Sequence, residues 1–458
     1  MSSRNHAPHG RTPRASSLGR RSPRAALAAR FLVAILLAAF APCQAGTPEV
    51  IAGHVARRDA AGHLLPWMDW SGALALEMQY YRGAPTDHGY PRFVTETFLL
   101  ADWTPDPARR DTIPATQSSL GILSYLAWYD YTGRKDAGFL ATARAMGDYL
   151  LQEALTPDSG TYPRFPRSTG TRGQFPLAPD TGSQSDRPFE IEPDKGGLVG
   201  HALLQLAGAT GEPRYARAAL HIAQLLSAHQ QPGDAQHSPW PFRVDYRSGE
   251  GRGPVSGNMS FILRLYDGLL AQGHREFAAP RQRLWDWVER WQIPDAARGG
   301  ALFAQFFEDH DAPGNRTAWA PLNLARYLLD GREAVDRNWE RDAGALLTFV
   351  RENFTHRESG VRVCHEQDED HDAWGGVNST YGAVLARYAR ATRSPALADE
   401  AREVLNFVLY AIDGQGRPRD LPAHSQPGGW QEDAHTDVIH NILDALRTWP
   451  EWADRDGP

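Results

Sequence analysis

The stretch that decides the fold runs from residue 200 to residue 226 and reads GHALLQLAGATGEPRYARAALHIAQLL. It starts with apolar residues at helical spacing and breaks at Thr210-Gly211-Glu212-Pro213. A second segment follows with an apolar stripe of the same period. Glycine commonly ends a helix, and proline is favoured at the first position of the next one. The stretch therefore predicts two helices joined by a tight turn.

The same unit of apolar helix, tight turn and amphipathic helix recurs along the chain. Residues 120–151 turn at Thr132-Gly133-Arg134, and residues 381–409 turn at Thr392-Arg393-Ser394-Pro395. No alternation typical of strands is sustained in the sequence. The pattern predicts about twelve helices. We expect them at 68–82, 115–131, 136–154, 196–209, 213–229, 256–272, 276–291, 316–330, 335–354, 374–391, 395–412 and 432–447.

The connections between these predicted helices alternate between short and long. The long ones, which are rich in Gly, Pro, Asp and His, lie at 83–114, 155–195, 230–255, 292–315, 355–373 and 413–431. Successive connections of up-and-down helices fall at opposite ends, so all the long loops are expected on one face. Long ordered loops are often functional. That face also carries the N-termini of the first helix of each pair, where backbone N–H groups are free.

Helix number, hairpin rhythm and aromatic loops together resemble the six-hairpin, or (α/α)6 toroid, glycosidase superfamily, which also includes polysaccharide lyases and sugar epimerases. The resemblance covers about residues 65–450 at the level of pattern and rests on no family-specific motif. It implies an all-α toroid with an active-site cleft at the N-terminal ends of the inner helices. The main rival is a helical-repeat scaffold, whose loops should be short on both faces.

The N-terminus is typical of an export signal. Residues 1–30 contain seven arginines and no acidic residue, and an apolar run follows from Phe31 to Phe40. Small residues then lead to Ala45, a plausible cleavage site. We therefore expect a signal peptide over residues 1–45, a single toroid domain over 46–458, and a secreted or periplasmic mature protein. The apolar run is too short for a stable membrane span.

The composition limits the classes of partner that the protein is expected to bind. The formal net charge of -7 argues against a nucleic-acid partner. The 14 tryptophans are either core residues or, in part, the floor of a sugar-binding cleft, because indole faces stack on pyranose rings. A poly- or oligosaccharide is the expected partner, and no cofactor is implied.

The loop before the predicted helix at 196–209 carries paired carboxylates. Glu190 and Glu192 stand two residues apart in extended chain, so their side chains point the same way. One carboxylate of such a pair can act as an acid in cleaving a glycosidic bond. We predict both as catalytic. The alternative is that they are solvated acids and that Asp194 caps the helix.

The loop at 292–315 ends in an aromatic and polar cluster. Flanking aspartates favour the protonated form of His310, which we predict as a catalytic residue. The following helix is expected to begin near Arg316, and the alternative is an ordinary surface loop. Substrate contacts are predicted for Asn315, Arg316 and Trp319.

The densest loop continues into a helix and reads CHEQDEDHDAWGGVNSTY over residues 364–381. The paired glycines allow close approach of a ligand, and an indole beside them could form the floor of a subsite. Asn378 and Tyr381 share a helix face because they stand three apart. We predict Asp372, Tyr381 and His371 as catalytic and Trp374 and Asn378 as substrate-binding. The acidic run could hold a divalent cation, but it lacks the spacing of an EF-hand, so no metal site is assigned.

The last long loop places Trp430 after two glycines, and we predict it as substrate-binding. Asp433, Asp437 and His440 share one face of the helix that follows. They could bind a metal ion, or the acids could complement the positive end of the helix dipole.

These residues favour a glycoside hydrolase that uses paired carboxylates. A first alternative is a polysaccharide lyase that acts on a uronate-containing polymer through a Tyr or His base. A second alternative is an exported sugar-binding or scaffold protein without catalysis.

Overall fold

The computed structural model describes residues 48–84, 86–87, 89–94, 98–99, 113–170, 186–307, 314–419, 429–430 and 433–454. The chain divides into Met1–Pro48 and a compact unit, Glu49–Pro458. The predicted signal peptide lies outside the described residues and stays a prediction. Among the described residues, no helix has the length and apolar character that a membrane crossing requires.

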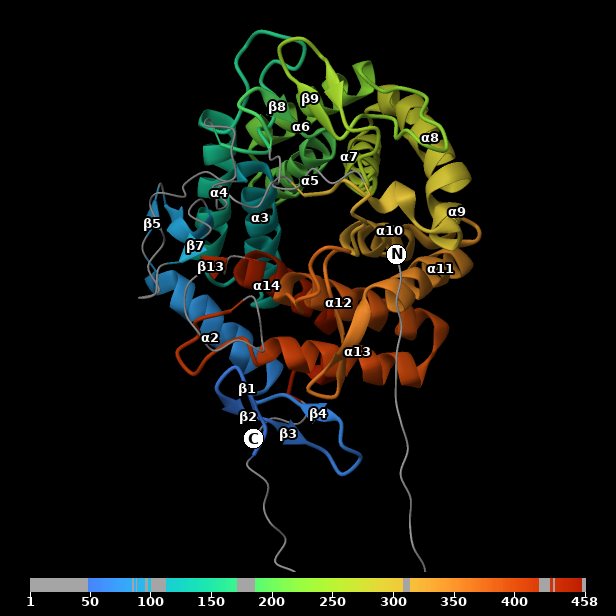
Figure 1. The fold of residues 1–458 in the computed structure, drawn as a ribbon. Helices are drawn as coiled ribbons and strands as arrows, with labels where there is room; N and C mark the ends of the chain where they lie inside the picture. Colours follow the sequence, from blue (N-terminus) through green and yellow to red (C-terminus); the bar gives the residue numbers. More distant parts are fainter. Residues whose placement is uncertain are drawn as a thin grey trace, which may run out of the picture. The chain divides into compact units, whose positions relative to one another are not determined.

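In the described part of the compact unit, six inner helices form a closed ring (Figure 1). Each contacts the next one, and the last returns to the first, which confirms the predicted (α/α)6 toroid. In ring order they are α3 (Pro114–Tyr131), α5 (Pro193–Thr210), α7 (Ser260–Ala271), α10 (Trp319–Gly331), α12 (Gly375–Thr392) and α14 (Asp433–Thr448).

An outer helix follows five of these inner helices after a tight turn. These outer helices are α4 (Ala137–Gln152), α6 (Pro213–Ala228), α8 (Ala278–Trp287), α11 (Trp339–Asn353) and α13 (Pro395–Leu409). The chain after α8 continues through a π-helical turn, Val288–Gln292, into the short α9 (Ile293–Asp295).

The two ends of the compact unit make the sixth pair. The N-terminal α2 (Trp70–Gly83) begins beside the residues that follow α14, because the amides of Trp70 and Ser71 donate to the carbonyl of Ala453 at 3.0 and 3.4 Å. The indole of Trp70 also donates to Asn406 of α13 at 2.8 Å. The N-terminal helix α2 is thereby held beside the C-terminal end of the compact unit.

The turns follow the chemistry that the sequence predicts. Gly211 ends α5 in the left-handed conformation at φ 71°, and Pro213 opens α6. Ser394 caps α13 by accepting a hydrogen bond from the amide of Leu397 at 3.4 Å. Local residues therefore fix where each of these helices ends and the next begins.

Three predicted helices begin later than expected. The starts are Ser260 instead of residue 256, Trp319 instead of 316, and Trp339 instead of 335. Before Trp319 the backbone makes extended bridges, Arg316 with Ala304 and Thr317 with Gln367, which hold the chain out of the helix. Arg316 and Thr317, which the sequence predicts on the first turn of this helix, therefore lie in a loop.

The long connections and the segment before α2 also carry short antiparallel strands, which the sequence does not predict. One sheet of three strands joins β8 (Glu190–Ile191), β9 (Arg243–Asp245) and β10 (Gly251–Arg252). The two-stranded pairs are β1 (Val50–Ile51) with β2 (His54–Val55), β3 (Arg57–Arg58) with β4 (Leu64–Leu65), β5 (Thr86–Asp87) with β6 (Tyr90–Pro91), β7 (Phe98–Leu99) with β13 (Gly429–Trp430), and β11 (Thr355–Glu358) with β12 (Val361–Cys364).

Two glycines set the spacing between α5 and α7. A Cβ atom on Gly197 would lie 2.7 Å from the backbone nitrogen of Ile262, and one on Gly200 would lie 2.6 Å from Leu265. The side chains that face the centre of the ring are therefore held on helices that pack at backbone contact.

The substitution Gly197→Ala should therefore destabilise the protein, by about 1–3 kcal/mol, because backbone atoms of α7 have to move. Gly208→Ala on the same helix is the matched control, since nothing lies within 4 Å of its added methyl group. Alanine is the better helix former, so the control should be neutral or more stable. Urea unfolding measures both, and equal stabilities of the two variants would contradict this account of the packing.

Candidate functional site

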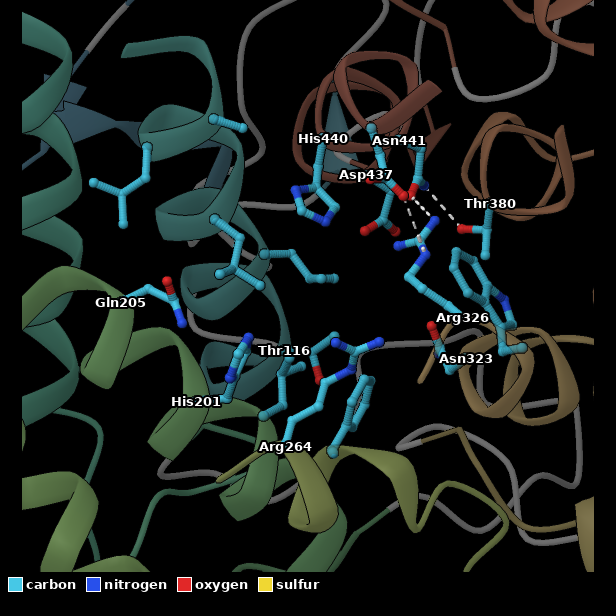
Figure 2. Close-up of a pocket in the computed structure, with 18 of the residues that line it drawn as sticks. Thr116, His201, Gln205, Arg264, Asn323, Arg326, Thr380, Asp437, His440 and Asn441 are labelled. Carbon is cyan, nitrogen blue, oxygen red and sulfur yellow. Dashed lines mark hydrogen bonds and ion pairs between the residues drawn. The ribbon is translucent and has the colours of Figure 1, made fainter. Parts of the chain in front are cut away.

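The inner helices enclose a cavity of about 1010 Å³, here called the axial cavity. Side chains from all of these helices line it, and part of its wall is apolar through Leu120 and Leu123 of α3 and Leu198 and Leu204 of α5. A space of this size accommodates a small sugar. Figure 2 shows the polar side chains that project into it from different helices.

Aromatic side chains surround one end of the axial cavity, here called the mouth. Trp319 is the first residue of α10, and Trp374 directly precedes α12. The indole N–H of Trp319 donates to Glu366 at 3.0 Å, and that of Trp374 donates to Asp370 at 2.9 Å. The ring of Phe306 lies nearly parallel to that of Trp319, with centroids 6.2 Å apart. The mouth therefore combines oriented aromatic rings with carboxylates, a pairing suited to sugars.

Two histidines lie deeper, His201 on α5 and His440 on α14 (Figure 2). Each stands seven or eight residues from the first residue of its helix, which is about 10–12 Å along the axis. Burial, together with Arg264, lowers the pKa of His201 to about 4. Burial, together with Arg326, lowers the pKa of His440 to about 3. Both imidazoles are therefore neutral near pH 7 and can accept a proton.

Next to the histidines lies a network of charged side chains, here called the floor. Asp330 of α10 pairs with Arg264 of α7 and Arg387 of α12. Asp444 of α14 pairs with Arg387 at 3.4 Å and with Arg326 at 3.7 Å. Burial opposes ionisation of Asp330, yet the two arginines hold the pKa of its carboxyl well below the usual range. The floor thus links four inner helices by ion pairs.

No protein-family model matches the chain, and no curated protein matches its sequence. Solved structures do match. Cellobiose 2-epimerase from Spirochaeta thermophila is 14% identical, with a TM-score of 0.58 and coverage of 83% of this chain and 96% of that chain. D-mannose isomerase is 13% identical, with a TM-score of 0.59 and coverage of 81% and 96%. A family 76 glycoside hydrolase from a bovine Bacteroides thetaiotaomicron strain is 12% identical, with a TM-score of 0.55 and coverage of 83% and 77%.

The chain has the fold of these proteins. At identities this low the likeness shows the fold alone.

The toroid brings some of the predicted residues to the axial cavity. Trp319 and Trp374 line its mouth, as expected for the N-terminal ends of inner helices. Asp437 and His440, noted for sharing a helix face, also line it. The side chain of Trp430 and all of His310 lie outside the described residues, so their roles stay predictions.

Two predicted residues of α12 are instead structural. Asn378 is buried and binds the backbone of Cys364, accepting from its amide and donating to its carbonyl at 2.7 Å in each case. Tyr381 is buried and donates to Glu400 of α13 at 2.5 Å. The two do share a helix face, but that face packs against β12 and α13. The expectation that they point into the cleft is therefore wrong.

Two further predicted residues lie at the surface. Asp372 and His371 are exposed and are not among the residues that line the axial cavity. A ring nitrogen of His371 lies 3.0 Å from the carbonyl oxygen of Asp368, which fixes the loop. The structure therefore does not bring them to the mouth, and Glu366 and Asp370 of the same loop are the acids that reach it.

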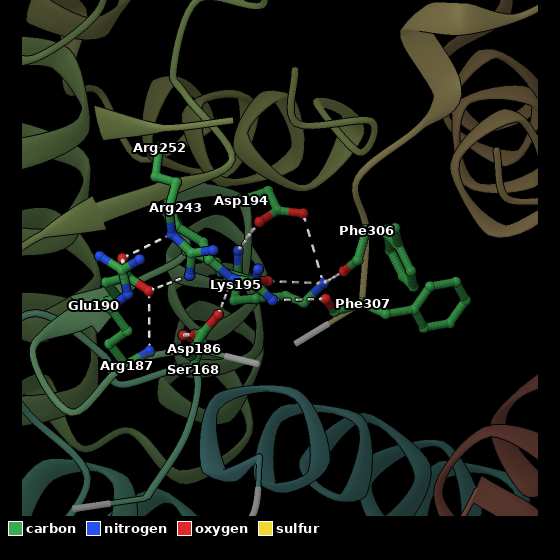
Figure 3. Close-up of polar contacts among 11 residues, drawn as sticks. Ser168, Asp186, Arg187, Glu190, Asp194, Lys195, Arg243, Arg252, Phe306 and Phe307 are labelled. Carbon is green, nitrogen blue, oxygen red and sulfur yellow. Dashed lines mark hydrogen bonds and ion pairs between the residues drawn. The ribbon is translucent and has the colours of Figure 1, made fainter. Parts of the chain in front are cut away.

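The paired carboxylates before α5 belong to a buried ion network. Figure 3 shows Glu190 in this network together with Lys195 and Arg243. Glu190 accepts two hydrogen bonds from Arg252 and one from the amide of Arg187. Burial opposes its ionisation, but these donors hold the pKa of Glu190 below its usual value. Glu192 lies 3.5 Å from Lys195 and 3.4 Å from Arg243. Neither carboxylate lines the axial cavity, so the structure does not support their catalytic assignment.

This network supports the mouth from behind. The ammonium of Lys195 donates to the carbonyl of Phe306 at 2.6 Å and sits 3.9 Å from the centre of its ring. The guanidinium of Arg243 donates to the carbonyl of Phe307 at 3.2 Å. Because both phenylalanines line the axial cavity, the buried charges position its aromatic rim.

The predicted substrate contacts Asn315 and Arg316 stabilise loops. Arg316 forms a bidentate pair with Asp368 at 2.8 Å for each bond, and Asn315 binds Gln367. Neither lines the axial cavity, so the assignment is not supported. In the part of the chain that the structure describes, no group of three or more His, Cys, Asp or Glu side chains is placed to hold a metal ion.

Sequence reasoning did not single out His201, Arg264 or Arg326. Each is a polar residue inside an otherwise apolar helix that the ring buries on both sides. That position was the available signal, because buried polar groups in such helices need partners or a ligand.

The buried neutral histidines should make stability depend on pH. The folded pKa of His440, about 3, lies below the ordinary value of 6.5, so its contribution is complete above pH 6.5 and is lost as the pH falls toward 3. The loss can reach about 1.4 kcal/mol per pH unit. Urea unfolding at pH 8 and pH 5 should show a smaller loss in His440→Gln than in the parent protein. Identical losses would mean that His440 is charged or exposed.

Proposed function

We propose that the protein is a carbohydrate-active enzyme that binds a sugar in the axial cavity and moves a proton on one of its carbon atoms. The reaction class is epimerisation or isomerisation, with His201 and His440 as base and acid. One observation carries the proposal: two neutral imidazoles project into one sugar-sized cavity, and an arginine lies beside each. The fold that the chain shares with a cellobiose 2-epimerase and a D-mannose isomerase also supports this reaction class.

The chemistry follows from these groups. One imidazole takes the proton from a carbon next to the sugar carbonyl, and the electron pair moves to the carbonyl oxygen. A low pKa makes imidazole a weak base, so the developing oxyanion needs stabilisation. The N–H group of the other neutral imidazole can donate a hydrogen bond to it. Return of a proton to the other face of the same carbon inverts it. For isomerisation, the proton is returned to the former carbonyl carbon, the former carbonyl oxygen gains a proton and the hydroxyl group of the first carbon loses one, so that the carbonyl group moves.

Hydrolysis is the second candidate. Among the described residues, Glu366, Asp370 and Asp437 line the axial cavity together with Trp319 and Trp374. Glycosidic cleavage needs two carboxylates on either side of the bond. Among the described acids that line the cavity outside the floor, Glu366, Asp370 and Asp437 are the candidates for such a pair, whereas Glu190, Glu192 and Asp372 do not line it. Lyase chemistry begins with the same proton abstraction and would also fall to the two histidines.

One experiment separates these reactions. The protein is incubated in D₂O with neutral and acidic sugars and oligosaccharides, and NMR follows the products. Deuterium entering the carbon skeleton while the glycosidic bonds stay intact supports epimerisation or isomerisation. New reducing ends without deuterium at carbon would show hydrolysis, and new alkene signals would show elimination. Binding without any change would favour a sugar-binding protein.

His201→Asn and His440→Asn should each lower the rate of deuterium exchange by about 10²–10⁴-fold, the usual contribution of a general acid or base. The matched control is His237→Asn, because His237 is exposed, pairs with Asp234 and does not line the axial cavity. The control should keep the parent rate. If both cavity variants exchanged at the parent rate, proton transfer by these histidines would be excluded.

We also propose that the mature protein is exported and begins near Gly46, from the arginine-rich start and the apolar run before Ala45. N-terminal sequencing of protein purified from the native cell should find this start, whereas an intact Met1 in the cytoplasm would contradict it.

A further inference from the structure

The axial cavity is polarised along its length. The described carboxylates Glu366 and Asp370 lie at the mouth, and Asp437 lies on α14 one turn before Asn441. The described part of the floor holds four guanidinium groups and two carboxylates. These are Arg264, Arg326, Arg387 and Arg447 with Asp330 and Asp444. Negative charge therefore faces the entering ligand at one end and positive charge at the other.

The excess of positive charge persists when exposure is considered. The side chain of Arg447 is 64% exposed, so water solvates its charge. The other three arginines are largely buried and share the two carboxylates. Arg387 pairs with both acids, and Arg264 pairs with one. Among the described residues of the floor, one buried cation is left without a full counter-charge, which is costly in a low-dielectric interior.

That cation is best identified as Arg326. Its side chain is 11% exposed, it donates to the neutral amide oxygen of Asn441, and its carboxylate contact with Asp444 is long at 3.7 Å. Its Nε, and also Nη2 of Arg264, are buried and have no hydrogen-bond partner among the described residues. Both arginines line the axial cavity, so an oxyanion in the cavity can accept hydrogen bonds from them.

We propose that the axial cavity binds the oxyanion of an acidic sugar, a carboxylate or a phosphate, through Arg264 and Arg326. The inference rests on the proposed function for the sugar, whereas the anion site rests on the floor itself. Guanidinium groups recognise both oxyanions through paired N–H donors. An anion held there places the remainder of the sugar beside the histidines and toward the aromatic mouth.

The bound anion would also act on the histidines. Arg264 lowers the pKa of His201, and Arg326 lowers that of His440, by charge repulsion added to burial. A carboxylate or phosphate at the two arginines cancels part of this repulsion. Both imidazoles then become stronger bases when an acidic sugar is bound than in the empty cavity. The anion site would thereby favour reaction of charged sugars over neutral ones of the same size.

Isothermal titration calorimetry tests the site without relying on turnover. The probes are D-glucuronate, D-glucose 6-phosphate and D-glucose, each titrated into the full-length protein. At least one acidic sugar should bind about tenfold or more tightly than glucose, as expected for a charge-assisted hydrogen bond. The better of the two identifies a carboxylate or a phosphate site. Equal affinities for all three sugars in the parent protein would overturn the proposal and require no variant.

Variants then locate the site. Arg326→Gln and Arg264→Gln should each weaken the acidic sugar by about tenfold or more and leave glucose unchanged. Arg447→Gln is the matched control, because it removes the same charge from an exposed position of the same network, and it should change affinity by less than about threefold. An equal loss of affinity in Arg447→Gln would mean that the overall electrostatic field of the protein causes the effect, and it would overturn the assignment of the site. If Arg326→Gln fails to fold, Arg264→Gln carries the test.

These experiments can disprove the anion site and the proposed function independently of each other. His201→Asn keeps both arginines, so it should still bind the acidic sugar more tightly than glucose. Binding of acidic sugars without deuterium exchange in the parent would sustain the anion site and reject the proposed function. Deuterium exchange on neutral sugars without any preference for acidic ones would support the proposed function and reject the anion site.

Discussion

The ion network of the floor is the constraint on which the rest of the cavity depends. Helices that close into a ring bury polar side chains from several directions, and each charge placed there needs a partner on another helix. Asp330 and Asp444 meet this need by joining α7, α10, α12 and α14. The same contacts leave Arg264 and Arg326 with unused donors. One set of side chains thus ties the helices together and creates a cationic end.

The mouth depends on a second buried network that lies outside the cavity. Lys195 and Arg243 hold the backbone of Phe306 and Phe307, and the acids before α5 hold Lys195 and Arg243 in turn. Removing one member would leave an uncompensated charge in the interior, which is more damaging than replacing a surface acid. Charged residues therefore serve the site here without touching a ligand.

Sequence reasoning located the helices because their signals are local. Apolar period, Gly211 with Pro213, and Ser394 with Pro395 each act within a few residues, and the structure confirms the predicted helices and the closed ring. The alternation of short and long connections also placed Trp319 and Trp374 at the mouth. These conclusions depend only on the local conformational preferences of residues that are close together in the sequence.

The site itself was harder to predict, because an inner helix is buried on both of its faces. Spacing correctly put Asn378 and Tyr381 on one side of α12, but it could not tell whether that side met the cavity or the outer helix. Thr380, between them, is the residue that lines the cavity. Likewise, the acids at 190 and 192 looked free because their partners, Arg252 for Glu190 and Arg243 for Glu192, lie more than 50 residues away in the sequence. Long-range pairing decides both cases, and a single sequence does not show it.

The central claim is that the ligand enters the axial cavity between the inner helices. A crystal structure of His201→Asn soaked with D-glucuronate and D-glucose 6-phosphate would test this most directly. The account predicts sugar density inside the ring, with its oxyanion at Arg264 and Arg326, a ring carbon beside His440 and an indole of Trp319 or Trp374 above it. Sugar bound at the exposed loop around Asp372, with the axial cavity holding only water, would contradict it.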